Sequence, residues 1–298
     1  MKRILPPVVG LLACALIAAC QPQADGQATA QPAATSNTTS TTSSAPTAVD
    51  NVALDGFLAA VYGHGASRTR PWVHAPLQAS FRDTETEANA PENVTRQLCA
   101  DESVIQGGQP ARLIAICGQP EDYGHPTPGL TDFFLLRMQD GKAVAAAQQH
   151  LQEYGSMGNP GEVKAMQLGA DLWGFVVRSS FSNMGYTAST WGLVLPKDGG
   201  FHDAGFFRSH IDNLGLVEGC DDASQPCTAP KAFNINFALD TDRSNPTAAH
   251  WPLVVTESGP ACGKPASATH RVLLDAATMR YQVPNILKRE TCKDDWTD

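Results

Sequence analysis

The chain has 298 residues, of which 21 are basic and 30 are acidic, and its formal net charge is −9. This balance argues against nucleic-acid binding, because contacts to phosphate groups require a basic patch. It also argues against attraction to anionic lipid head groups by charge, whereas a basic protein partner or a cation would suit it.

The N-terminus has the pattern of a secretory signal. Basic residues follow Met1, and an apolar run extends from Ile4 to Ala19. This run is too short to span a bilayer comfortably, since a spanning helix needs about 20 apolar residues, and Pro6 and Pro7 interrupt it. We therefore predict that residues 1–19 form a signal peptide that is removed.

The segment Ile17-Ala18-Ala19-Cys20 resembles the lipobox of bacterial lipoproteins. The resemblance implies that diacylglycerol is attached to Cys20 and that the chain is cut before this residue. It also implies that the new amino group is acylated, for example with palmitate, so that the lipid anchors the protein to a membrane. Gln21 stands where an aspartate would favour the inner membrane, so the resemblance implies the outer membrane, facing the periplasm. The alternative is an ordinary signal peptide with a chance cysteine.

Residues 20–50 are expected to form a linker. After Cys20 they are mostly Ala, Thr, Ser, Gln and Pro, and they cannot bury enough apolar area to offset the entropy of ordering. Residues 51–298 are then left for the globular part, which is enough for one large domain or two small ones. Without Lys2 and Arg3, 19 basic residues face 30 acidic ones, a net charge of −11.

Six cysteines remain once Cys14 is removed and Cys20 carries lipid. An even number in an oxidising compartment predicts disulfide bonds. Sequence alone does not choose among the pairings, but we favour neighbours: Cys99–Cys117, Cys220–Cys227 and Cys262–Cys292. A metal site is the weaker interpretation, because no C-x-x-C pair occurs.

The first predicted element of the globular part is a helix over Val52–Tyr62. Leu54, Phe57, Leu58 and Val61 share one helical face, Asp50 can cap the start and Gly63 can end it. We expect the helix to dock on the main body; a membrane-surface helix is the alternative, although no basic flank supports it. A second short helix after Pro91, through Val94 and Leu98, is also predicted.

After Cys99 the pattern changes to strands and turns, with hairpin turns near residues 140, 170 and 198. The predicted strands are Ala111–Cys117, Thr131–Met138, Lys142–Gln149, Glu162–Leu168, Leu172–Arg178, Thr187–Leu195, Phe201–Ile211, Ala232–Leu239, Pro252–Thr256, Thr269–Leu274 and Met279–Val283. The Ala-rich run 142–149 could instead be helical. The fold class is therefore mainly β: an antiparallel hairpin meander, sandwich or propeller-like, with one or two short N-terminal helices.

A short internal repeat supports the β interpretation. Trp173, Trp191 and Trp251 are each followed by a small or rigid residue and then by three apolar residues. We interpret these tryptophans as core or rim packing rather than as an aromatic binding strip.

Common catalytic and cofactor-binding motifs do not occur in the sequence: it has no nucleophile elbow, zinc-binding helix, P-loop or dinucleotide fingerprint. The nearest approach to a catalytic cluster is His202 with His210 and Asp212, of which the last two share a strand face. A nucleophile or a third metal ligand is missing, so surface polar residues at a strand end are the favoured interpretation, and no cofactor is expected.

The sequence contains one candidate calcium loop. Asp240, Asp242 and Ser244 alternate as in the start of an EF-hand loop, but Asn245 replaces the turn glycine and Trp251 the closing glutamate. An Asx turn at a strand end is the alternative. The acidic loop between Cys220 and Cys227 is a further candidate for protein recognition. The favoured interpretation is a structural turn closed by a disulfide bond.

These observations favour a lipid-anchored envelope protein that binds another protein, as inhibitor or immunity-type lipoproteins do, by analogy of architecture alone. An envelope hydrolase acting through His202, His210 and Asp212 is the alternative from another class. A structural component of an envelope assembly is the third hypothesis.

Overall fold

The computed structural model describes residues 47–74, 93–220, 227 and 229–292. Its first element is helix α1, Asn51–Tyr62, as the sequence predicts. The Asp50 side chain accepts a hydrogen bond from the Ala53 N–H at 2.8 Å, and the N–H of Gly63, at a φ of 82°, donates to the Ala59 carbonyl. The buried face holds Leu54, Phe57, Leu58, Val61 and Tyr62. None of the helices in the described ranges is long and apolar enough to cross a membrane.

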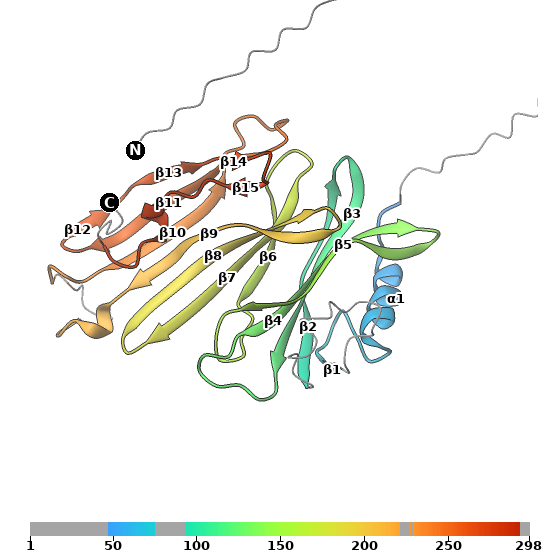
Figure 1. The fold of residues 1–298 in the computed structure, drawn as a ribbon, viewed down its shortest axis with the longest axis horizontal. Coiled ribbons are helices and arrows are strands. Elements are labelled where there is room, and N and C mark those ends of the chain that lie inside the picture. The colour runs from blue at the N-terminus through green and yellow to red at the C-terminus, as the bar shows by residue number, and fades with distance from the viewer. Residues whose placement is uncertain (1–46, 75–92, 221–226, 228, 293–298) are drawn as a thin grey trace, which may run out of the picture. The chain divides into compact units, whose positions relative to one another are not determined.

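The first sheet is antiparallel and has five strands in chain order (Figure 1). They are β1 (Trp72–His74), β2 (Val94–Gln106), β3 (Gln109–Pro120), β4 (Gly129–Gln139) and β5 (Lys142–Tyr154). The Ala-rich segment after residue 141 is thus a strand and not a helix. Its partner β4 supplies the pairing, and the predicted turn at Asp140-Gly141 lies in the left-handed region, with φ of 50° and 75°.

The predicted second helix through Val94 and Leu98 is wrong, because both residues belong to β2. At the start of this strand Val94 and Arg96 are buried and Thr95 is exposed, which is the two-residue alternation of a strand. The strand is fixed by pairing with β3, from Val94 opposite Pro120 to Gln106 opposite Gln109. This pairing outweighs the weak local helical pattern on which the prediction rested.

The second antiparallel sheet has eight strands. The order β6 to β12 again follows the chain, and β13 pairs with β11 beside β12. The strands are β6 (Glu162–Gln167), β7 (Trp173–Asn183), β8 (Tyr186–Lys197), β9 (Gly200–Asp212), β10 (Asn234–Thr241), β11 (Leu253–Ala261), β12 (Lys264–Ala266) and β13 (Thr269–Val272). A small pair, β14 (Leu274–Asp275) and β15 (Arg280–Tyr281), and two 3-10 helices, η2 (Leu214–Leu216) and η3 (Asn285–Lys288), complete the described elements. The predicted meander of hairpins is therefore confirmed.

The first sheet lies between α1 and the second sheet (Figure 1). On one face, Ile114, Ile116 and Phe134 pack against α1. On the other, Leu113 and Phe133 pack against residues of the second sheet. The ring centroids of Phe133 and Phe175 lie 4.8 Å apart across this interface. Burial of both faces explains why β3 and β4 are continuous apolar runs rather than alternating ones.

The C-terminal segment is fixed to the second sheet by a buried ion pair. Arg289 donates to both carboxylate oxygens of Glu257, at 2.9 and 2.6 Å, and His270 Nε2 lies 2.8 Å from the same carboxylate. Burial by itself raises the pKa of Glu257, but Arg289 and His270 outweigh it, so that this pKa stays below its ordinary value. The carboxylate therefore remains charged and keeps Arg289 in place.

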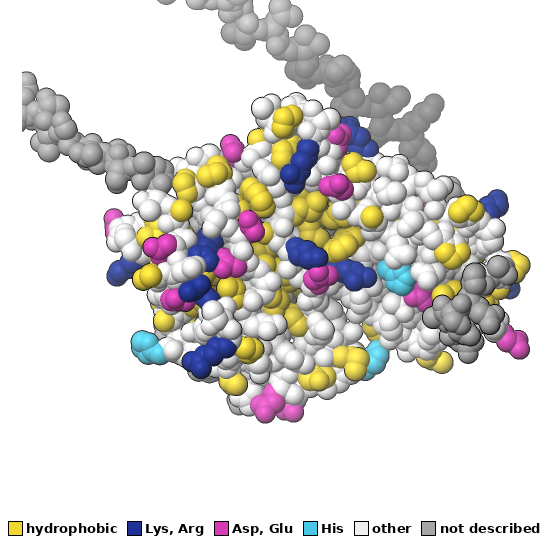
Figure 2. All heavy atoms as spheres, turned by 180° about the vertical axis from the view of Figure 1, so that it is seen from behind, with side chains coloured by type: hydrophobic (Ala, Val, Ile, Leu, Met, Phe, Trp, Pro, Cys, Tyr) yellow, Lys and Arg dark blue, Asp and Glu magenta, His cyan; other side chains and the backbone are white. Residues whose placement is uncertain are grey.

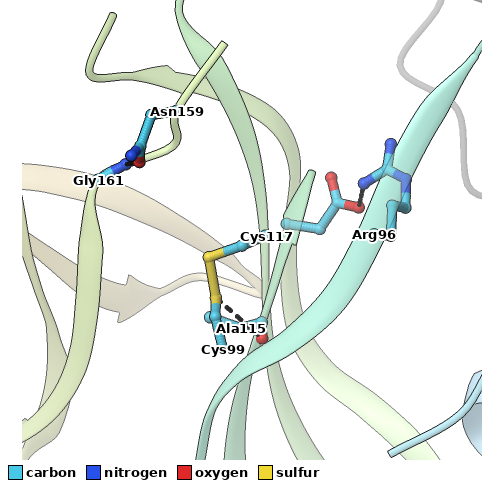
Figure 3. The surroundings of a disulfide bond; sticks show 7 residues. Arg96, Cys99, Ala115, Cys117, Asn159 and Gly161 are labelled. Carbon is cyan, nitrogen blue, oxygen red and sulfur yellow. Dashed lines mark hydrogen bonds and ion pairs between the residues drawn. A yellow bond between two sulfur atoms is a disulfide. The ribbon is translucent and has the colours of Figure 1, made fainter. Parts of the chain in front are cut away.

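The six cysteines form the three neighbouring pairs, with Cα–Cα distances of 5.7 Å for Cys99–Cys117, 5.1 Å for Cys220–Cys227 and 5.9 Å for Cys262–Cys292. Figure 3 shows the first of these bonds between β2 and β3, with Cys99 Sγ 3.4 Å from the Ala115 carbonyl oxygen. Cys99 is the extra residue of a β-bulge, since Leu98 and Ala100 pair with the adjacent residues Ile116 and Ala115.

Candidate functional site

Several strand connections from the two sheets converge on one cleft of about 600 Å³, here named the turn cleft. Its walls are the β2–β3, β6–β7 and β8–β9 turns, the β10–β11 connection and Met279 before β15, and strands β4 and β5 contribute the remaining residues. The lining residues are 106–107, 135, 137, 146–147, 170–172, 196–199, 247, 249–250 and 279. Loops carried on a rigid scaffold are the usual location of binding residues.

Backbone hydrogen bonds join the turns around the cleft. The Gly107 N–H donates to the Asp171 carbonyl at 2.9 Å, which connects the first sheet to the second. The Ala170 N–H donates to the Ala248 carbonyl at 2.9 Å, and the Gln148 N–H to the Gly199 carbonyl at 3.1 Å. These turns are therefore fixed relative to one another, and a ligand would not need to order them.

Two β-bulges occur in the strands beside the cleft. Ala146 is skipped in the β4–β5 register, and Ala204 is skipped between β8 and β9. A bulge bends its strand and redirects the side chains next to it, and bulges are frequent beside binding sites. Here the first bulge lies at Ala146, itself a lining residue, and the second lies in the β8–β9 hairpin, whose turn lines the cleft.

Asp171 and Asp198 are the acidic residues of the turn cleft. Both are exposed, and within the described residues neither forms an ion pair. Of the basic lining residues, Arg137 donates to the Gln106 carbonyl at 3.0 Å, and Lys197 is exposed beside Asp198. Two carboxylates are thus available to a cationic group of a ligand.

Figure 2 shows the face seen from behind, where acidic and basic side chains are interspersed and hydrophobic side chains reach the surface between them. Neither sign of charge gathers into one large patch on this face. This face therefore offers no single charged area to a partner.

The predicted histidine cluster is not assembled. His202 Nε2 lies 2.9 Å from the Met279 carbonyl and lines a neighbouring pocket that also contains Asp198 and Asp203. His210, near the other end of β9, has its Nε2 2.9 Å from Asn234 Oδ1 and 3.6 Å from Asp212. The pair His210–Asp212 therefore exists, and Ser189 stands opposite His210 in the β8–β9 register. Among the described residues, however, no hydroxyl or thiol is hydrogen-bonded to the His210 ring.

The candidate calcium residues lie at the end of β10 and just beyond it. Asp242 accepts the Ser244 N–H at 3.0 Å and pairs with Arg271 Nε at 3.0 Å, while Asp240 accepts the Thr241 N–H. The Asp242–Ser244 contact is the Asx turn given above as the alternative. In the part of the chain that the structure describes, no group of three or more His, Cys, Asp or Glu side chains is arranged to hold a metal ion. Calcium binding stays a prediction.

Further predictions fall outside the described residues: the signal peptide over residues 1–19, lipidation of Cys20, and the linker 20–50 up to residue 46. The recognition loop between Cys220 and Cys227 is among them, since residues 221–226 are not described. The sequence did not indicate the turn cleft. The Asp-Gly turn at 198 and the turn at 170 are visible locally, but their convergence with Thr247 and Met279 depends on how the strands pair and on how the two sheets pack.

A buried polar cluster at α1 was also missed. Asp132 is fully buried and accepts hydrogen bonds from Tyr62 Oη and Arg96 Nη1, each at 2.5 Å, and from the Leu151 N–H at 2.7 Å. Burial, followed by the charge of Asp132, raises the pKa of Tyr62 well above its ordinary value. The phenol therefore stays protonated and donates, and the cluster connects the helix to the sheet.

Comparison of the chain with protein-family models, with curated proteins and with solved structures finds no match.

Proposed function

We propose that this protein is a lipid-anchored envelope protein that binds another protein at the turn cleft and does not act as an enzyme. The observation that carries the proposal is the cleft itself, built from the connections of both sheets and holding Asp171 and Asp198 without a cationic partner among the described residues. An exposed carboxylate in a preformed cleft is suited to a Lys or Arg side chain of a partner.

The net charge and the predicted membrane location support the same proposal. With 19 basic and 30 acidic residues after removal of the predicted signal peptide, the chain would attract a basic partner over the distance that salt screening allows. A lipid on Cys20, followed by a linker of thirty residues, would hold the domain within about 30 Å of the membrane as a random coil. Such a placement suits an inhibitor or immunity-type protein that intercepts a partner in the periplasm.

The proposal is tested by capture of envelope proteins on the immobilised mature chain in detergent. We expect a basic protein to be retained and to elute as salt is raised. The variant Asp171→Asn/Asp198→Asn should retain at least about tenfold less of it, since each carboxylate would contribute one charge-assisted contact.

A matched control is Glu121→Gln/Asp122→Gln, which removes the same charge from the exposed β3–β4 connection, outside the cleft. It should capture as well as the natural chain at equal salt. Equal retention by the cleft variant and the natural chain would rule out the turn cleft as the binding surface. Turnover of an envelope substrate that is lost in His210→Ala would favour the hydrolase instead.

A further inference from the structure

A second pocket shares no lining residue with the turn cleft. Its volume is about 590 Å³, and it is lined by the end of β3, the β3–β4 and β5–β6 connections, the start of β6 and the second half of β7. We name it the arginine pocket, because Arg178 is the one Lys or Arg among its described lining residues. Glu162 is the one carboxylate among them.

The guanidinium of Arg178 makes no hydrogen bond or ion pair within the described residues, and its one close contact there is with an aromatic ring. Its Cζ lies 5.9 Å from the centre of the Trp191 ring, which belongs to the residue opposite Arg178 in the β7–β8 register. Trp191 Nε1–H in turn donates to the Phe237 carbonyl at 3.1 Å. A cation–π contact with a ring fixed in this way positions the guanidinium but uses none of its N–H donors. These donors are therefore available to an acceptor on a ligand.

The carboxylate nearest in register to Arg178 is engaged elsewhere. Glu162 stands opposite Arg178 on β6, but its ion pair is with Lys164 on the same strand. The hydrogen bond from Lys164 is the largest cause that holds the pKa of Glu162 below its ordinary value, and the charge of Arg178 contributes less. Lys164, Glu162 and Arg178 together carry two positive charges and one negative charge. A ligand with one negative charge would balance them, whereas a second negative charge would be repelled by Glu162.

Neutral donors also line the pocket. Asn159 Oδ1 accepts the Gly161 N–H at 2.8 Å, as Figure 3 shows, and this contact orients the amide, whose own N–H groups make no hydrogen bond within the described residues. Gln119 supplies a second amide. The His125 ring, 5.7 Å from Phe181 between centroids, supplies an imidazole. Such groups can complete the hydrogen bonds of an oxygen that is bound to Arg178.

The walls of the pocket are joined to one another. The Gly158 N–H donates to the Thr127 carbonyl at 2.8 Å, which connects the β5–β6 segment to the β3–β4 segment. Ser156 Oγ donates to the Ser180 carbonyl at 3.1 Å, which connects the β5–β6 segment to β7. A ligand would therefore not need to order these segments, and the cost of binding is lower.

We propose that the arginine pocket binds the carboxylate group of a small monoanionic ligand. A planar guanidinium can donate two parallel hydrogen bonds to a carboxylate, and Asn159 can donate to a remaining lone pair. Met157 lines the pocket and is 54 % exposed, so its thioether can pack against an apolar or aromatic ligand body. The volume lies in the range of small-molecule sites. This inference is independent of the proposed protein partner, because the two sites have no residue in common.

The test is isothermal titration of the mature chain in a non-ionic detergent at low salt, with benzoate as the probe. We expect saturable binding of benzoate with a Kd below about 10 mM. Benzamide has almost the same shape without the charge, and inorganic phosphate carries more than one negative charge at pH 8. Each should bind at least about tenfold more weakly than benzoate.

Two variants of the pocket should act in opposite directions. Arg178→Gln removes the cation and should weaken benzoate binding at least about tenfold. Glu162→Gln removes the like charge beside the ligand and should strengthen binding about threefold. Arg280→Gln is the matched control, because it removes an exposed arginine outside the pocket, and it should bind benzoate as the natural chain does. Circular dichroism checks that each variant is folded.

The proposal is overturned if the natural chain gives no saturable heat with benzoate, or if Arg178→Gln binds it with unchanged affinity. Binding of benzamide or phosphate as tight as that of benzoate would also overturn it, as would weaker binding by Glu162→Gln. The cleft variant Asp171→Asn/Asp198→Asn should bind benzoate with unchanged affinity even where it has lost a protein partner. Failure of this proposal is thereby distinguished from failure of the proposed function.

Discussion

At the scale of single residues, the charged side chains that are buried within the described ranges stand in ion pairs. Arg96 and Asp132 are 2 % and 0 % exposed, and the pair is completed by Tyr62 and the Leu151 N–H. Removing one partner of such a pair leaves the other charge buried without a partner. This lowers the free energy of unfolding far more than breaking a solvent-exposed pair does. The carboxylates of the turn cleft differ, because they are exposed and have no ionic partner within the described residues.

The first prediction concerns Arg96. Arg96→Met should lower the free energy of unfolding by about 3–5 kcal/mol, since Asp132 would remain buried without its cation. Urea unfolding followed by circular dichroism measures this difference. Arg280→Ala is the matched control, because it breaks a pair with Asp203 in which both side chains are more than half exposed, and its effect should be small. Equal losses in the two variants would contradict the structural role given to Arg96.

The second prediction concerns pH and His150. Burial, outweighing the charge of Asp132, lowers the pKa of His150 from its ordinary value of 6.5. As pH falls below 6.5, His150 therefore becomes protonated in the unfolded chain while it stays neutral in the folded chain. The free energy of unfolding decreases as a result. Above 6.5 this contribution is fully present.

The urea midpoint of the natural chain should thus fall between pH 7.5 and 5.5 by more than that of His150→Gln, which cannot titrate. Parallel pH profiles for the two proteins would show that His150 contributes no such linkage.

At the scale of elements, local chemistry determined what could be predicted. Asp50 and Gly63 mark the two ends of α1. The turns at Asp140-Gly141 and Asp198-Gly199 separate strands whose apolar residues are contiguous. The sequence therefore predicted these elements. β2 was missed, because it carries Asp101, Glu102 and Ser103 at its centre and is defined by its non-local partner β3. The division of the meander after β5 was not visible either, since it follows from packing of the two sheets around Phe133 and Phe175.

The third prediction compares two disulfides at this scale. Cys262–Cys292 closes a separation of 30 residues and Cys220–Cys227 one of 7. By loop-closure entropy the longer bond contributes about 3.7 kcal/mol and the shorter about 2.4 kcal/mol.

The double variant Cys262→Ala/Cys292→Ala should therefore lose more stability in urea than Cys220→Ala/Cys227→Ala. The larger loss also has a structural reason, because Cys292 follows the segment that carries Arg289 to Glu257. A larger loss from the shorter bond would contradict this account.

At the scale of the whole molecule, the proposed anchor and the proposed binding site are separate parts. The fourth prediction addresses the anchor. Cells given labelled palmitate should incorporate it into the natural chain and into Cys14→Ser, but not into Cys20→Ser, which should leave the membrane fraction. Labelling that survives in Cys20→Ser would refute the lipid site.

The central claim is that the turn cleft recognises a protein. Its most direct measurement is photo-crosslinking in intact cells, with a benzoylphenylalanine placed either at Thr247, an exposed lining residue of the cleft, or at Asp122 in the exposed β3–β4 connection. The account predicts a discrete adduct with a basic protein from position 247, reduced by Asp171→Asn/Asp198→Asn, and none with that protein from position 122. The same adduct from position 122, or none from position 247, would contradict it.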